Sequence, residues 1–166
     1  MKIVHGYGLQ EHCRVRGLLA SGLGAFMLVS PARATELPRD PEDLVATIRK
    51  AIENRDYERF KKLVFWKHAG KIKRRIVRFQ IRRGLGRPIR SISFEDFPKD
   101  GLAGVEATGK LVANMPVTNR VRVVYDESPI SDSGKLPTSV FLVGKLDDAY
   151  RIGLVVRKPG WDDDDD

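Results

Sequence analysis

The spacing of apolar residues changes once along this chain, and that change constrains the fold more than any other feature. Between residues 41 and 83, apolar residues recur every three to four positions, as on one face of an amphipathic helix. From Ile89 onward they alternate with polar residues, which is typical of strands with one buried face. Helices followed by strands predict an α+β domain, with two to three N-terminal helices packed on a curved antiparallel sheet of about four to five strands.

The first helix is predicted to begin at Asp40-Pro41, because Asp40 can cap free N–H groups and proline suits the first helical position. Its apolar face would comprise Leu44, Val45, Ile48, Ala51 and Ile52. Asn54 suits a left-handed helix ending, and Asp56 can cap a second helix. That second helix would align Tyr57, Phe60 and Val64. A single kinked helix is the alternative.

A row of basic residues follows these helices. Between Lys61 and Arg90 the chain has twelve Lys or Arg and no Asp or Glu. The stretch Lys71–Arg83 fits a helix or a strand; we favour a helix, because Arg82-Arg83-Gly84 resembles a helix C-terminus. As a helix, it has an apolar stripe that the core would need, formed by Ile72, Ile76 and Phe79. Another face would gather the cations Lys71, Arg74, Arg75, Arg78 and Arg82.

Strands are predicted in the second half of the chain, where side chains alternate between polar and apolar. The expected ranges are 89–97, 105–113, 117–125, 138–146 and 149–157. The strand at 138–146 is apolar on both faces, which indicates a central or doubly covered position. Asp147-Asp148 is predicted to be the turn between the last two strands. The polar segment 128–136 is predicted to be a loop.

The N-terminus is typical of a secretory signal. A basic lead precedes the uncharged apolar run 17–30, and Ala32-Arg33-Ala34 follows it, which predicts cleavage between Ala34 and Thr35 and export to the periplasm or the extracellular space. An uncleaved anchor or a buried helix is the alternative. The predicted organisation is therefore a signal at 1–34, one domain at 35–161 and an acidic tail at 162–166. The mature chain would lack cysteine, which excludes disulfides and thiolate zinc sites, and would have no transmembrane segment.

Two stretches carry a resemblance to a known superfamily. They are LVATIRKAIENRDYERFKKLV, which reads as helix, polar corner and helix, and VFLVGKLDDAYRIGLVV, a late pair of strands. This order resembles the nuclear transport factor 2-like, cystatin-like cone fold. The resemblance implies a curved sheet that encloses a pocket with its helices. It does not imply one function, because that superfamily holds isomerases, dehydratases and many non-catalytic binders.

The basic row is the strongest functional signal. We predict a non-enzymatic binding module that acts through its basic face or its concave sheet. The basic face would meet an anionic partner, either an acidic polymer or lipid headgroups, and export argues against nucleic acid. A solvated helix face whose charge only aids solubility is the other interpretation of the basic row. The alternative is a small cone-fold enzyme or carrier with an apolar pocket near Tyr57, Tyr125 and Tyr150. The mature chain has one histidine, His68, which we interpret as a surface or capping residue. No catalytic group, metal site or cofactor is predicted.

Overall fold

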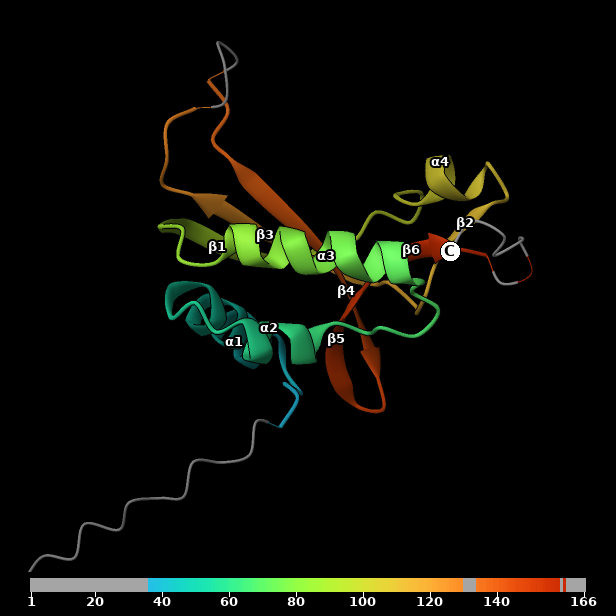
Figure 1. The fold of residues 1–166 in the computed structure, drawn as a ribbon, viewed down its shortest axis with the longest axis horizontal. Helices are drawn as coiled ribbons and strands as arrows, with labels where there is room; N and C mark the ends of the chain where they lie inside the picture. Colours follow the sequence, from blue (N-terminus) through green and yellow to red (C-terminus); the bar gives the residue numbers. More distant parts are fainter. Residues whose placement is uncertain (1–35, 130–133, 159, 161–166) are drawn as a thin grey trace, which may run out of the picture. The chain divides into compact units, whose positions relative to one another are not determined.

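Four helices and six strands form the part of the chain that the structure describes. The computed structural model describes residues 36–129, 134–158 and 160, so the predicted signal, the tip of the loop 128–136 and the acidic tail lie outside them. The helices are α1 (Pro41–Glu53), α2 (Tyr57–Leu63), α3 (Lys71–Gly84) and the short α4 (Ala103–Glu106). The strands are β1 (Ile89–Asp96), β2 (Leu111–Ala113), β3 (Asn119–Tyr125), β4 (Thr138–Leu146), β5 (Ala149–Gly153) and β6 (Val155–Arg157) (Figure 1).

The first two helices are separate, as predicted, and each has an acidic cap. An Asp40 carboxylate oxygen accepts a hydrogen bond from the Asp43 N–H at 2.7 Å, and one from Asp56 accepts from the Arg59 N–H at 2.9 Å. These bonds satisfy backbone donors that a helix N-terminus leaves free. The prediction of a left-handed Asn54 was wrong: Asn54 has φ −86°, and Arg55 has φ 55°. Asn54 still donates its N–H to the Lys50 carbonyl, so the chain turns one residue later.

The main sheet is antiparallel, with the strand order β1-β3-β4-β5. Three strand spacings would separate β1 from β5 by roughly 14 Å in a flat sheet. The rings of Phe94 on β1 and Tyr150 on β5 nevertheless meet edge to face, with centroids 5.5 Å apart. The sheet therefore curves, and its inner face carries Val121, Val123 and Val143 into the core that the helices complete. The predicted α+β class is confirmed.

The strands 89–97, 117–125 and 138–146 were predicted well, and so was the turn at Asp147-Asp148. Both turn residues have positive φ, 50° and 60°, which is the backbone of the tight hairpin turns that match strand twist. The strand predicted at 105–113 was wrong over most of its length. Residues 103–106 form α4, Gly109 follows with φ 67°, and only Leu111–Ala113 is extended. The apparent alternation there arises from exposed small residues rather than from a buried face.

The predicted strand 149–157 is divided at Leu154. The side-chain oxygen of Asn114 accepts a hydrogen bond from the Leu154 N–H at 2.8 Å, and the Asn114 N–H donates to the Leu154 carbonyl at 2.9 Å. These bonds occupy both backbone groups of Leu154. The chain then leaves the main sheet, and β6 pairs with β2 in a second, two-stranded sheet.

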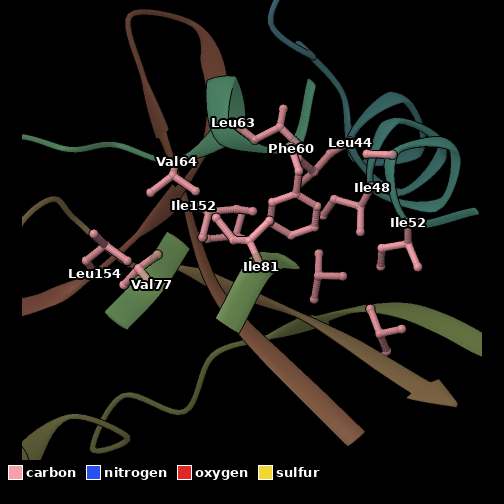
Figure 2. Close-up of a cluster of buried hydrophobic side chains, with 14 of the residues drawn as sticks. Leu44, Ile48, Ile52, Phe60, Leu63, Val64, Val77, Ile81, Ile152 and Leu154 are labelled. Carbon is pink, nitrogen blue, oxygen red and sulfur yellow. The ribbon is translucent and has the colours of Figure 1, made fainter. Parts of the chain in front are cut away.

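Helix α3 is rotated relative to the prediction. Ile72, Ile76 and Phe79 were expected in the core, yet they are 46%, 46% and 62% exposed. Val77 and Ile81 are buried instead, and Figure 2 shows them pointing toward the other core side chains.

None of the helices in the described ranges is both long and apolar enough to cross a membrane.

An arginine on α3 accounts for the rotation. The Arg74 guanidinium donates to the Ala69 carbonyl at 2.7 Å and to the Trp66 carbonyl at 3.2 Å. These bonds tie one side of α3 to the turn that precedes it. Because residues four apart lie on the same side of a helix, Val77 and Ile81 are aligned with each other and close to the side of Arg74.

Candidate ligand cavity and basic helix

A cavity of about 430 Å³ lies between α3 and the inner face of the sheet. Helix α3 packs mainly against α2 rather than against the strands. The space between α3 and the sheet is this cavity. The volume is within the usual range for small-molecule sites. Its wall consists of Ile52, Phe60, Val64, Lys73, Val77, Gln80, Ile81, Arg83, Gly84, Arg87, Tyr125, Ser139, Val140, Phe141, Leu142, Ile152, Gly153, Leu154 and Val155.

Most of that wall is apolar. Val77 and Ile81 contribute from α3, Phe60 from α2 and Ile152 from β5, and all four are at least 92% buried. Figure 2 shows Ile81 beside Ile152 and Phe60. Phe60 is fixed by an edge-to-face contact with Phe141 of β4, at 5.3 Å between centroids. The hydrophobic effect therefore favours a ligand with a hydrocarbon part in this space.

The polar groups of the wall are cationic or neutral. Helix α3 contributes Lys73, Gln80 and Arg83, the following loop contributes Arg87, and the strands contribute Tyr125 and Ser139. Within the described ranges, no Asp, Glu or His lines the cavity. Lys73 and Arg83 also have no carboxylate within ion-pair distance in that part of the chain. The electrostatics of the cavity therefore favour an anion.

Arg87 is the exception, because its charge is already paired. Its guanidinium donates two hydrogen bonds to the Glu127 carboxylate, at 2.7 and 2.6 Å, and lies 3.7 Å from the centroid of the Tyr125 ring. The hydrogen bond from Arg87 lowers the pKa of Glu127 from its ordinary value, and the same bond raises the pKa of Arg87. The Tyr125 hydroxyl in turn donates to the Ser139 hydroxyl at 3.1 Å. This network fixes one end of the cavity.

Of the three tyrosines predicted to form a pocket, Tyr125 lines the cavity and the other two lie elsewhere. The Arg82 guanidinium lies 4.7 Å from the ring centroid of Tyr57, and Tyr150 packs against Phe94. Sequence reasoning missed Lys73 and Arg83 as cavity residues, because it treated the cations of α3 as one face. At about 100° per residue, Lys73 falls on the opposite side of the Ile72 and Ile76 stripe from Arg75, so a signal existed for Lys73. Arg83 falls between Ile72 and Ile76, so the helical pattern did not indicate its place in the wall.

The five cations predicted to bind anions lie in different environments. Arg74 is held by backbone carbonyls, as described above. Arg78 lies 6.0 Å from the Trp66 ring centroid, and Arg82 lies over Tyr57. Lys71 and Arg75 are exposed. No cation of α3 forms an ion pair with the described residues, so the positive charge of the helix is not neutralised there.

The histidine and two aspartates outside the cavity have structural environments. His68 is exposed in a turn with φ 59°. Asp56 caps α2, and Asp96 accepts a hydrogen bond from the Asn119 side chain at 3.2 Å. In the residues that the structure describes, no group of three or more His, Cys, Asp or Glu is arranged to hold a metal ion.

A separate charge cluster lies on the outer face of the sheet. Glu95 on β1 accepts hydrogen bonds from Arg122 at 2.9 Å, Ser93 at 2.7 Å and Arg120 at 2.7 Å. The bonds from Arg122 and Ser93, with a smaller one from Arg120, lower the pKa of Glu95 to about 2. This cluster links β1 to β3, and none of its residues lines the cavity.

Comparison of the chain with known protein families, with curated proteins and with solved structures found no match. The functional argument therefore depends on the cavity and on the charge of α3.

Proposed function

We propose that this protein is a non-enzymatic binding module for an amphipathic anion. The hydrocarbon part of the ligand occupies the cavity, and its acidic group lies beside Lys73 and Arg83. The observation that carries the proposal is the composition of the cavity wall. Most of its residues are apolar, and within the described residues two of its cations have no carboxylate partner and no acidic group lines it. A carboxylate with an alkyl chain has the complementary chemistry.

The same composition favours binding over acid–base catalysis. General acids and bases are most often His, Asp or Glu, and none of these lines the described wall. Tyr125 is the wall's other titratable candidate, but its hydroxyl is bonded to Ser139 and its ring is covered by Arg87. The small cone-fold enzyme is therefore the weaker alternative.

The proposal includes a relationship to the nuclear transport factor 2-like, cystatin-like cone fold. It is supported by α1, α2 and α3 on the concave side of a curved antiparallel sheet, with a cavity between them. The proposal also includes export, on the basis of the basic lead, the apolar run and Ala32-Arg33-Ala34. In an exported protein the ligand would be met outside the cytoplasm.

The test is calorimetric titration of the protein with laurate and with dodecanol, the neutral ligand of equal chain length. We expect laurate to bind and dodecanol to bind at least tenfold more weakly, because only laurate can accept charge-assisted hydrogen bonds, worth about 1.5–3 kcal/mol each. The double variant K73E/R83E should lose that preference. The matched control K50E/K99E reverses two exposed cations outside the wall and should bind laurate as the native protein does.

A second variant separates charge from volume. Val77→Phe places a larger side chain in the cavity wall and should weaken both ligands, with folding checked by circular dichroism. Should Val77→Phe not fold, the laurate and dodecanol comparison and K73E/R83E still decide the question. Equal affinity for the two ligands, or laurate binding unchanged in K73E/R83E, would refute the proposed function.

A further inference from the structure

The outer face of α3 has an apolar stripe that no part of the described chain covers. Ile72, Ile76 and Phe79 follow the i, i+4, i+7 spacing of one helical face, and they are 46%, 46% and 62% exposed. Scattered single apolar residues are normal on a protein surface. Here three of the four large hydrophobic side chains that are most exposed in the described residues lie on one helix, in one row.

Cations lie on both sides of this stripe. At about 100° per residue, Lys71, Arg75, Arg78 and Arg82 fall along one edge, while Lys73 lies beyond the other. The helix has seven Lys or Arg among its 14 residues and no acid. Arg78 and Arg82 are positioned over aromatic rings, so part of their conformational freedom is already lost before any partner binds.

We propose that α3 docks on an anionic lipid bilayer, with its axis along the surface. Ile72, Ile76 and Phe79 enter the boundary between headgroups and acyl chains, and the flanking cations contact lipid phosphates. Large apolar side chains beside Lys and Arg are typical of helices that lie in a membrane interface. The sequence predicted that Ile72, Ile76 and Phe79 would be buried in the core. Val77 and Ile81 are buried in their place, so the apolar face that a membrane-surface helix needs is exposed.

The shape of the surface favours a bilayer over a protein groove. The inner face of α3 is fixed in the domain by Val77, Ile81 and Arg74, so a partner can reach only the outer face. A protein groove that encloses a helix contacts much of the helix circumference, whereas a flat bilayer surface contacts only one face of the helix. The absence of acidic residues between Lys61 and Arg90 adds charge complementarity to anionic headgroups.

This inference does not depend on the proposed ligand cavity, although α3 contributes to both. Lys73 and Arg83 line the cavity, so they are left unchanged in the variants that test the bilayer. Ile72, Ile76, Phe79, Lys71 and Arg75 do not line it. If the protein does not bind vesicles, laurate binding is still expected. If it does not bind laurate, vesicle binding is still expected.

The experiment is co-sedimentation with vesicles of phosphatidylcholine alone and of phosphatidylcholine mixed with phosphatidylserine. We expect partition into the mixed vesicles, weaker at high salt, and little into phosphatidylcholine alone. The variant I76S/F79S should lose tenfold or more in partition, because it removes apolar side chains and retains every charge. K71E/R75E should lose at least as much. Both pairs are exposed, so the fold is expected to persist.

A matched control separates the helix from general surface properties. K50E/K99E reverses two exposed charges off α3 and should partition as the native protein does. In Phe79→Trp, the added indole fluorescence should be quenched by brominated acyl chains in the mixed vesicles.

Three results would overturn the inference. Partition of I76S/F79S equal to that of the native protein would mean that charge alone acts, as for an acidic polymer such as heparin. A dimer in solution that is lost in I76S/F79S would mean that a second copy covers the face. No partition of the native protein at low salt would exclude a bilayer.

Discussion

Glu95 provides the sharpest test of the electrostatics, because its carboxylate on β1 accepts hydrogen bonds from Arg120 and Arg122 on β3 and from Ser93 on its own strand. Replacing it by glutamine keeps its shape and removes its charge. Folding lowers the pKa of Glu95 from 4.5 to about 2, chiefly through the hydrogen bonds from Arg122 and Ser93. A carboxyl with a lower pKa in the folded state stabilises the fold above its unfolded pKa. That stabilisation is lost as the pH falls from about 4.5 to about 2.

The size of the effect follows from the same pKa. A change from 4.5 to about 2 corresponds to at most ~3.5 kcal/mol, since each unit of pKa change is worth about 1.4 kcal/mol. The side chains of Glu95 and Arg120 are 28% and 29% exposed, and that of Arg122 is 36% exposed. Solvent screening therefore reduces the expected contribution to about 1–2 kcal/mol at neutral pH.

The assay is urea unfolding of the native protein and of E95Q, followed by circular dichroism between pH 2 and pH 6. We expect the native protein to be more stable by about 1–2 kcal/mol near pH 6. The two curves should approach each other near pH 2, where Glu95 is increasingly protonated. Glu106→Gln, at an exposed position on α4, is the control and should follow the native curve. A difference between E95Q and the native protein that is constant from pH 2 to pH 6 would refute the reasoning.

Three further substitutions test the packing by urea unfolding. A Cβ on Gly144 would overlap the Pro116 carbonyl oxygen, so Gly144→Ala should destabilise the protein by about 2 kcal/mol or more. The control Gly104→Ala has open space around it and should be neutral or stabilising. Equal effects of the two substitutions would contradict this packing. Asn114→Ala removes hydrogen bonds at 2.6, 2.9 and 2.8 Å and should destabilise by about 1–3 kcal/mol; a neutral effect would show that these bonds are dispensable. Asp148→Gly relieves a positive φ of 60° and should stabilise by about 1 kcal/mol; a less stable variant would contradict the argument from backbone strain.

The sequence predicted the elements that have a local cause. Asp40 and Asp56 cap helices through bonds to residues three positions later, and the sequence shows both partners. The turn at Asp147-Asp148 and the long strand 138–146 are likewise specified by neighbouring residues. Interactions of this kind do not depend on the rest of the fold, so they can be read before the fold is known.

The errors came from long-range contacts. Asn114 divides the predicted strand 149–157 by bonding to Leu154, 40 positions away, and no local pattern announces that contact. The orientation of α3 is set by Arg74, which bonds to carbonyls of the preceding turn, and its periodicity allows two apolar faces. Tyr125 was predicted as a pocket residue from its position on a strand, whereas Lys73 and Arg83 required the orientation of α3.

The charge of α3 connects the cavity with the outer face. Seven cations on a 14-residue helix repel one another, and in the described part of the chain no carboxylate pairs with them. The helix is retained because Val77 and Ile81 are buried and because Arg74 is bonded to carbonyls. Such a helix is stabilised by any anion that binds the folded state, whether a carboxylate beside Lys73 or phosphates on the outer face, because ligands that prefer the folded state raise its stability. The uncompensated charge is therefore the feature that the two proposed sites share.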